Sequence, residues 1–373
     1  MTVYAFPGTE GAKVEFKSRY EHFIGGEWTP PVKGQYFENV TPVTGKVFCE
    51  VARGTAEDID AALDAAWKAA PAWGATSPAE RALVLHRIAD RMEENLEMLA
   101  VAETWDNGKA VRETLNADVP LAIDHFRYFA GAIRAQEGGL SQVDEDTVAY
   151  HFHEPLGVVG VISPWNYPLV LAISDAIAAI MAGNTVVLKP SEKDPSASLW
   201  LANLWKEAGL PDGVFNVVSG NRTMVSKVLE HPGIDAISFV GSTPVAHIVQ
   251  NAGVTHGKRV QALGGANNHA IVMPDSDLDF AAQHISAAAF GAAGEGDDDP
   301  LPGRPRPGDP VVVAVARQPL LDPVGQPQQG ELAQALREGI GGRGSGQRDR
   351  AAQQHQQSGE RARQARLRGS AHR

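Results

Sequence analysis

The sequence predicts an α/β fold built on a parallel sheet, followed by a long low-complexity extension. Short β-rich runs alternate with helix-length segments between residues 155 and 275, and this alternation is typical of parallel strands joined by crossover helices. Amphipathic helical segments fill much of the preceding sequence. After Glu295 the composition changes abruptly, because residues 296–373 hold 12 arginines, no lysine and no aromatic residue. We therefore expect an ordered part up to Glu295 and a tail that is disordered or translated from a shifted reading frame.

The N-terminal third predicts helices with defined starts. The segment 55–70, TAEDIDAALDAAWKAA, begins with a threonine followed by an acidic residue three positions later, and its apolar residues recur at helical spacing. Ser77 precedes a second such segment, in which Pro78 takes the first helical position and Glu80 completes a capping box. Helical sequence continues to about residue 135.

Residues 145–155, EDTVAYHFHEP, alternate like a strand and place His151 and His153 on one side. With Glu154 these histidines could bind a metal, but the pattern suggests no third ligand, and a structural role is favoured. The acidic run PDSDLDF, residues 274–280, lacks the glycine and glutamate of a calcium loop and is better read as a helix-capping turn. We predict no metal site.

Five β-rich runs follow: GVVGVIS, TVVLKPS, VFNVVSG, AISFVGS and HAIVMPD. In a parallel sheet, ligands bind beyond the carboxyl ends of the strands, so the residues after each run are the candidates for a binding site.

The first run leads into SPWNYP, which places Trp165 and Asn166 between two prolines. A fixed side-chain amide is a suitable donor to an oxyanion. The alternative is a turn asparagine that bonds its own backbone, and for an isolated asparagine this alternative is favoured.

The other strand ends carry charged residues and glycines. In LKPSE, Lys189 can meet a phosphate or a ribose hydroxyl and Glu192 can accept from a ribose diol, although a solvated charge pair is an equal alternative. In FVGST, Gly241 allows close approach of the backbone, and Ser242 can cap a helix whose N-terminus would face a pyrophosphate. Paired glycines in QALGGANNH mark another tight approach.

Composition bounds the class of function. The chain has 373 residues and a formal net charge of -12, which argues against non-specific binding to nucleic acid. We find no apolar stretch long enough for a signal peptide or a membrane span, and we expect a cytoplasmic protein without nucleic-acid or membrane partners. The one cysteine, Cys49, excludes an intramolecular disulfide and a multi-cysteine zinc site.

Taken in order, PWN, KPSE, FVGST and LGG resemble the NAD-dependent aldehyde dehydrogenase superfamily, and FIGGEW near the start adds to the match. Residues 20–160 are similar to bacterial acetaldehyde dehydrogenases. Residues 161–295 are similar to methylmalonate-semialdehyde dehydrogenases, which are CoA-acylating. Ala262 stands where most of the family has a glutamate that activates the hydrolytic water, and this departure agrees with the acylating type.

The resemblance implies an aldehyde dehydrogenase-like fold with a Rossmann-type NAD-binding sheet and a truncated α/β catalytic domain. It implies NAD as cofactor, CoA as an acyl acceptor, a small aldehyde as substrate, and Asn166 as the donor to the oxyanion. The residues expected to contact the cofactor are Ile162, Ser163, Trp165, Lys189, Ser191, Glu192, Gly220, Gly241, Ser242, Leu263 and Gly264. The expected divisions are an N-terminal helical part of the cofactor domain (1–141), an oligomerisation-type strand (142–154), the NAD-binding domain (155–264), a truncated catalytic domain (265–295) and the tail (296–373).

One departure puts turnover in doubt. FGAAGE matches the approach to the family's Gly-Glu-Arg-Cys, but Gly296 stands for the arginine and Asp297 for the nucleophilic cysteine. Cys49 lies far upstream in a strand-like run and is not expected to replace it. We therefore expect a family member without turnover, with a non-catalytic nucleotide-binding relative or a non-functional frameshifted product as the alternative. The resemblance implies a family of homo-oligomers, and we expect this chain to lack the C-terminal segment that completes the oligomer.

Overall fold

The computed structural model describes residues 4–265, 269–273, 275–290 and 312–314. The described residues up to 265 form one compact unit, and those from 269 onward belong to a second. The tail after Glu295, including Asp297, lies outside the described residues apart from residues 312–314, so the predictions for it stay untested.

The first unit is built around a sheet whose described strands run in the order β12-β11-β8-β9-β10-β2-β3. The first five of these are mutually parallel, as the alternation of strands and helices predicts, whereas β2 and β3 add antiparallel strands beside β10. In chain order the strands are β2 (His22–Ile24), β3 (Glu27–Thr29), β8 (Val158–Ile162), β9 (Thr185–Lys189), β10 (Phe215–Val217), β11 (Ala236–Val240) and β12 (Arg259–Leu263).

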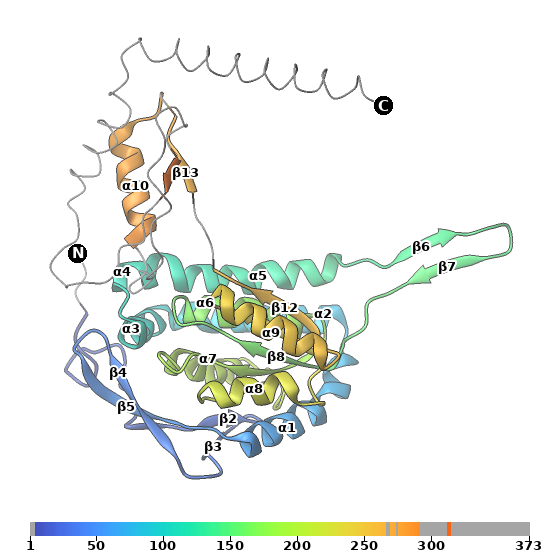
Figure 1. Cartoon of the computed structure of the whole chain (residues 1–373), viewed down its shortest axis with the longest axis horizontal. Coiled ribbons are helices and arrows are strands. Elements are labelled where there is room, and N and C mark those ends of the chain that lie inside the picture. The colour runs from blue at the N-terminus through green and yellow to red at the C-terminus, as the bar shows by residue number, and fades with distance from the viewer. Residues whose placement is uncertain (1–3, 266–268, 274, 291–311, 315–373) are drawn as a thin grey trace, which may run out of the picture. The chain divides into compact units, whose positions relative to one another are not determined.

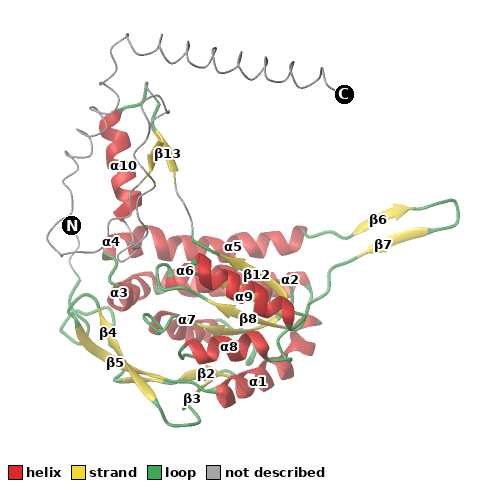
Figure 2. Ribbon diagram, in the orientation of Figure 1, coloured by secondary structure: helices red, strands yellow, loops and turns green. Residues whose placement is uncertain are grey.

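Four crossover helices connect the parallel strands and cover both faces of the sheet (Figures 1 and 2): α6 (Pro168–Met181), α7 (Ser196–Glu207), α8 (Arg222–Glu230) and α9 (Thr243–Thr255). The strand β8 is buried along its whole length, because both of its faces are covered. Its side chains alternate between two cores: Val159 and Val161 pack with α6 and α7, whereas Val158 and Ile162 pack on the side of α8 and α9.

Helices from the N-terminal part pack on both sides of this layer: α1 (Ala56–Gly74), α2 (Pro78–Glu94), α3 (Leu96–Asn107), α4 (Val111–Glu113), the π-helical turn η1 (Thr114–Asp118) and α5 (Val119–Ala135). Both predicted helix starts are confirmed. The Ser77 hydroxyl accepts from the Glu80 N–H at 3.2 Å, and the Glu80 carboxylate accepts from the Ser77 N–H at 2.7 Å. The Asp58 carboxylate accepts from the Thr55 N–H at 2.7 Å.

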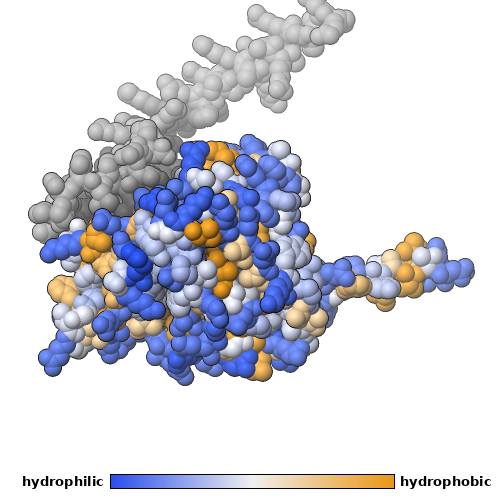
Figure 3. All heavy atoms as spheres, turned by 90° about the horizontal axis from the view of Figure 1, so that it is seen from below, coloured by the Kyte–Doolittle hydropathy of each residue, from blue (hydrophilic) through white to orange (hydrophobic). Residues whose placement is uncertain are grey.

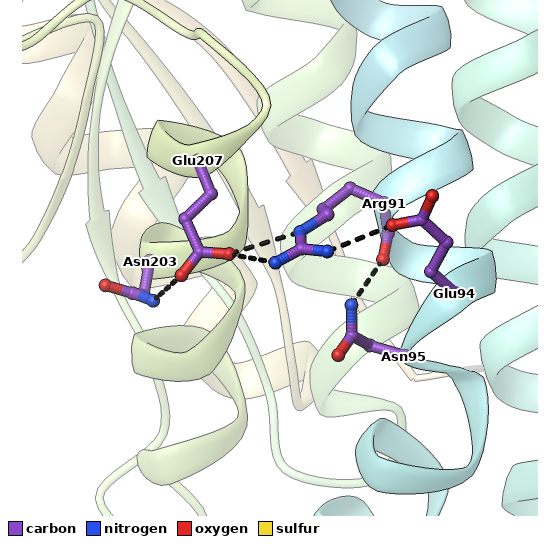
Figure 4. A network of polar contacts seen from close by, with 5 residues as sticks. All are labelled: Arg91, Glu94, Asn95, Asn203 and Glu207. Atoms are coloured by element: carbon purple, nitrogen blue, oxygen red, sulfur yellow. Dashed lines mark hydrogen bonds and ion pairs between the residues drawn. The ribbon is translucent and has the colours of Figure 1, made fainter.

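An exposed polar network joins α2 to α7 (Figure 4). Arg91 donates two hydrogen bonds to one oxygen of Glu207, at 3.1 and 2.7 Å, and a third to Glu94 at 3.0 Å. Asn203 donates to the other oxygen of Glu207 at 2.8 Å. Because the Arg91 side chain is 42% exposed, solvent screens this pairing and it stabilises the contact between the two helices only weakly.

The sequence predicts a helical N-terminal part, residues 1–141, but this part also contains several strands. β1 (Arg19–Tyr20), β4 (Tyr36–Thr41) and β5 (Lys46–Ala52) make a separate small sheet, and FIGGEW forms the β2–β3 hairpin on the edge of the main sheet. Phe23 of β2 pairs with Val217 of β10, far along the chain. Local sequence did not predict this pairing because its partners are distant in sequence.

A second hairpin, β6 (Gly139–Gln142) and β7 (Val148–His151), stands away from the helices and sheet of the first unit (Figure 1). It lies at the segment where an oligomerisation-type strand is expected. Large apolar and aromatic side chains are exposed on it and beside it: Leu140, Val143, Val148, Tyr150 and Phe152. Figure 3 shows orange areas on this projecting segment.

The second unit contains α10 (Leu278–Phe290) and the antiparallel pair β13 (His269–Ile271) and β14 (Val312–Ala314). The run HAIVMPD therefore forms a strand, but this strand does not join the seven described strands of the main sheet. The Asp277 carboxylate accepts from the N–H groups of Asp279 and Phe280 at 3.0 and 3.1 Å, which confirms the helix-capping interpretation of PDSDLDF.

Candidate active site

The parallel sheet brings the predicted cofactor residues to one edge. Ile162 ends β8 and pairs with Lys189 at the end of β9, while Val240 of β11 pairs with Leu263 at the end of β12. Because all five strands run in the same direction, the loops that follow them meet at the same edge. These loops carry Ser163, Trp165, Ser191, Glu192, Gly220, Gly241, Ser242 and Gly264.

The order of the strands places a topological switch point inside this edge. From β8 the chain moves outward through β9 and β10, and it then returns to the opposite side of β8 to form β11 and β12. Crossovers that leave two neighbouring strands in opposite directions open a crevice at their carboxyl ends, where doubly wound proteins bind nucleotides. The loop after Ile162 and the loop after Val240 border this position.

Glycines allow the loops after β11 and β12 to lie close together. A Cβ atom on Gly241 would stand 2.5 Å from the Phe239 ring, and one on Gly264 would stand 3.0 Å from the Thr243 hydroxyl. The Gly265 N–H donates to the same hydroxyl at 3.0 Å, which ties the two loops together. Gly220 has a different role, because a Cβ there would lie 2.5 Å from the Met224 side chain of α8.

Ser242 occupies the N-cap position of α9, as the sequence predicts, but its side chain makes no capping hydrogen bond. The predicted position of Ser242 at the helix start is therefore confirmed, but the side-chain cap is not formed. The helix begins with Thr243 and Pro244, and the preceding backbone is extended at Ser242. Its first-turn N–H groups consequently remain available to an anion at the switch point.

Lys189 enters the site from a buried position at the end of β9. It is 6% exposed, and burial lowers the pKa of its ammonium, while Glu192 and Asp194 act in the opposite direction. Among the described residues, no carboxylate lies within 4 Å of this ammonium. These surroundings contradict the alternative that Lys189 belongs to a solvated charge pair. A buried cation without an ion pair favours a role in binding an anionic or hydroxyl-bearing ligand.

Asp194, which sequence reasoning did not single out, lies beneath the same loop. It is 1% exposed, and burial together with Asp106 and Glu103 raises the pKa of its carboxyl well above the usual value. The loop itself is shaped by a hydrogen bond from the Lys193 N–H to the Ser191 hydroxyl at 3.1 Å. Sequence gave little signal for Asp194, since its neighbours come from distant helices.

Asn166 lies in a half-buried turn between β8 and α6, flanked by two aromatic rings that each face an ammonium group. The Lys193 ammonium is 5.2 Å from the centre of the Trp165 ring, and the Lys109 ammonium is 3.2 Å from the centre of the Tyr167 ring. Pro168 begins α6 directly afterwards. The turn therefore has a fixed conformation that suits a positioned amide donor.

Residues 28–296 match the Aldehyde dehydrogenase family. The chain belongs to this family. It is 61% identical over 250 residues to the EPTC-inducible aldehyde dehydrogenase of Rhodococcus erythropolis, a match that covers 67% of this chain and 49% of that protein. It is 57% identical over 265 residues to an acetaldehyde dehydrogenase of Pseudomonas aeruginosa, which covers 70% of this chain and 52% of that protein.

Solved aldehyde dehydrogenase structures resemble the chain over the same region. The NAD⁺ complex of the aldehyde dehydrogenase from Bacillus cereus matches with a TM-score of 0.70 and 35% identity, over 73% of this chain and 56% of that one. PnpE in complex with nicotinamide adenine dinucleotide matches with a TM-score of 0.71 and 36% identity, over the same shares of the two chains. The chain spans about half the length of the curated relatives it matches. These relatives are named as aldehyde dehydrogenases in general or as acetaldehyde dehydrogenase, and not as methylmalonate-semialdehyde dehydrogenase. The family is therefore confirmed, whereas the predicted likeness of residues 161–295 to the methylmalonate-semialdehyde type is not.

Cys49 is the one cysteine of the sequence, and its surroundings are poorly suited to a thiolate nucleophile. It is 3% exposed in β5, and its sulfur lies 3.9 Å from the Ser196 hydroxyl. Burial, aided by Asp106, raises the pKa of the thiol to about 12. At neutral pH such a thiol is almost entirely protonated, so it is a structural residue.

Buried polar atoms at the edge of the sheet are consistent with the family's dinucleotide. The hydroxyls of Ser163 and Ser219 are buried at the carboxyl ends of β8 and β10, and neither has a hydrogen-bond partner among the described residues. Unpaired buried hydroxyls are costly unless a ligand or water satisfies them. With Lys189 beside them, the residues present fit a ligand that carries ribose and phosphate groups.

The described part of the chain contains no cluster of metal-ligating side chains and no helix that could span a membrane. No group of three or more His, Cys, Asp or Glu side chains there is placed to hold an ion. His151 and His153 are exposed, and their rings are 6.2 Å apart at nearly right angles. Across these same residues, no helix is both long and apolar enough to cross a membrane.

Proposed function

We propose that the chain binds NAD at the switch point of its parallel sheet and holds a small aldehyde beside Asn166, but does not turn the aldehyde over. The observation that carries this proposal is the convergence of Ser163, Lys189 and Gly241 at one edge, around a position where doubly wound sheets bind nucleotides. Two solved relatives that are complexes with NAD support the choice of cofactor.

Each residue has a role that its chemistry allows. Lys189 and Glu192 hold the hydroxyls of the adenosine ribose, and the backbone at Gly241 and Ser242 faces the pyrophosphate at the N-terminus of α9. Asn166 donates its amide to the aldehyde oxygen. NAD, when bound, supplies the nicotinamide ring that accepts a hydride.

The proposed loss of turnover follows from the nucleophile. The sequence has Asp297 where the family has cysteine, and a carboxylate is a weak nucleophile toward a carbonyl and leaves readily. Cys49 is buried and protonated, so it does not substitute. The chain then retains binding without the covalent step.

For the intact lineage, we propose a CoA-acylating semialdehyde dehydrogenase. Ala262 of β12 is half-buried beside an apolar cluster and brings no carboxylate to activate a water. An acyl-enzyme at such a site would be released by a thiol acceptor, and CoA fits that need.

Replacing Lys189 by alanine is expected to weaken NAD binding about tenfold, because one charge-assisted contact contributes on the order of 1.4 kcal/mol. Titration of the purified chain with NAD, followed by calorimetry, measures this. Lys68→Ala, which removes an exposed lysine of α1, is the matched control and should bind as the wild type does. Equal affinity in wild type and Lys189→Ala would contradict the assignment of Lys189 to the cofactor.

The wild-type chain is expected to form no NADH from malonate semialdehyde, with or without CoA, in an absorbance assay whose positive control is an enzyme known to oxidise this aldehyde. Cys49→Ser should not change this result. Turnover by the wild type that vanishes in Cys49→Ser would overturn the proposed role of Cys49 as structural. If Gly296→Arg/Asp297→Cys restores NADH formation, the rate should depend on CoA, and a CoA-independent rate would contradict the acylating assignment.

A frameshifted gene is the competing explanation for the residues after Glu295, and the absence of lysine among 78 residues that hold 12 arginines favours it. Resequencing the DNA around codons 294–299 and translating the other two frames tests it. A frame that restores Gly-Glu-Arg-Cys would establish an interrupted dehydrogenase gene, whereas the given frame would establish a chain that has lost its nucleophile.

A further inference from the structure

Lys109 is a buried lysine that contacts the Asn166 turn through Tyr167 but has no role assigned in the proposed function. It follows α3 and is 2% exposed. Its ammonium donates to Asp118 at 2.6 Å and lies 3.2 Å from the centre of the Tyr167 ring. Tyr167 directly follows Asn166 and is the N-cap residue of α6. One buried cation therefore connects a carboxylate to the turn that carries the proposed oxyanion donor.

The backbone around Lys109 holds the ammonium in place. Gly108 has a φ of 82°, and a Cβ there would lie 2.7 Å from Pro42, so the chain turns sharply against another segment. The Asn107 side chain accepts from the Lys109 N–H at 2.8 Å. Lys109 consequently enters the interior from a rigid turn.

Asp118 reaches Lys109 from the end of the π-helical turn η1. Such turns are rare and often occur at functional sites, because the wider turn redirects side chains that a regular helix would place elsewhere. Thr114, at the start of η1, donates its hydroxyl to the Ala100 carbonyl of α3 at 2.9 Å, and this bond holds the turn against that helix. The wide turn thus places a carboxylate beside the Lys109 ammonium.

Three side chains of the described residues surround the Lys109 ammonium: Asp118, Glu103 and Tyr167. Glu103 is fully buried near the pair, and burial together with Asp118 raises the pKa of its carboxyl well above the usual value, while Lys109 acts in the opposite direction. Asp118 accepts the hydrogen bond of the ammonium, and the Tyr167 ring offers its electron-rich face to the same cation. A cation–π contact in such a dry environment is stronger than the exposed Lys193–Trp165 contact on the other side of Asn166.

We propose that Lys109 is a positioning residue for Asn166. Its ammonium, fixed by Asp118, holds the Tyr167 ring, and the ring sets the orientation of the turn from which the Asn166 amide is presented. This proposal rests on the proposed role of Asn166 as donor to the aldehyde oxygen. Lys193, exposed over Trp165, contributes less because solvent competes for its charge.

The test follows the side-chain amide signal of Asn166 in ¹⁵N-edited spectra of the full chain, assigned through its loss in Asn166→Asp. Lys109→Met keeps the length of the side chain but removes the charge, and we expect it to shift or broaden the Asn166 signal. Lys193→Met is the matched control and should leave the signal close to its wild-type position. An unchanged Asn166 signal in folded Lys109→Met would overturn the proposal.

A second variant covers the case in which Lys109→Met does not fold. Tyr167→Leu leaves the Lys109–Asp118 pair intact but removes the ring, and it should also shift the Asn166 signal, whereas Tyr167→Phe keeps the ring and should shift it less. Equal shifts in the two Tyr167 variants, or none, would contradict the proposal. Titration of the wild type with NAD tests the proposed function separately, since failure to bind NAD leaves the response of Asn166 to Lys109 unaffected.

Discussion

Replacing Trp205 by alanine is expected to destabilise the first unit by about 3–5 kcal/mol, because the change leaves a large cavity in a closely packed core. Trp205 lies on α7 and is 1% exposed. Its ring is 5.2 Å from that of Phe126 on α5 and 4.2 Å from that of Phe215 on β10, measured between centres. The side chain therefore connects the N-terminal helices to the sheet that forms the site.

Urea denaturation followed by circular dichroism measures this loss of stability. Trp67→Ala is the matched control, since Trp67 is 43% exposed and gives up mainly one hydrogen bond to the Gly233 carbonyl. We expect the control to cost about 1–2 kcal/mol. If the two variants lost the same amount of stability, Trp205 would not be a central core residue.

Protonation of His22 alone is expected to lower the free energy of unfolding by about 3 kcal/mol as the pH falls from 6.5 to 4. The rate of this loss is about 1.4 kcal/mol per pH unit. His22 of β2 is fully buried, and burial lowers the pKa of its imidazole from 6.5 to about 4. The unfolded chain binds the proton first, so this contribution is fully present above pH 6.5 and is lost as the pH falls toward 4. The nearby Asp58 carboxylate, 3.7 Å from Nε2, acts in the opposite direction but is the smaller effect.

The geometry explains why the folded state keeps His22 neutral. Its Nδ1 accepts from the Ser219 N–H at 3.2 Å, which a protonated ring cannot do. This bond joins β2 to the loop after β10, at the edge of the sheet that carries the proposed site. Protonation therefore weakens the contact between the N-terminal hairpin and that loop.

Urea denaturation at several pH values between 7 and 5 gives the free energy of unfolding as a function of pH. The slope of this dependence in the wild type is compared with that in His22→Asn. The comparison is needed because burial raises the pKa values of Asp106 and Asp175 to about 6. Protonation of these two carboxylates stabilises the folded protein as the pH falls, and this opposes the effect of His22. His86→Asn, at an exposed position, should keep the wild-type slope. A His22→Asn variant with the same slope as the wild type would show that His22 does not carry the dependence.

The sequence by itself determined the parallel sheet, the helix starts at Thr55 and Ser77, and the strand ends that carry Asn166, Lys189 and Gly241. These features depend on local patterns: β-rich runs, capping residues, and glycines and prolines at fixed positions. The register of the five strands then places those strand ends at one edge, which the alternation of strands and helices already implied.

Only the tertiary structure decided the surroundings of those residues. Lys109, Asp118 and Tyr167 come from three separate elements, and the placement of Asp118 depends on a π-helical turn that the sequence pattern did not reveal. The addition of β2 and β3 to the sheet and the burial of Cys49 also rest on contacts between distant segments. Local sequence specifies the local conformation of the backbone, whereas burial and charge pairing are properties of residues brought together by folding, and these set the chemistry of each group.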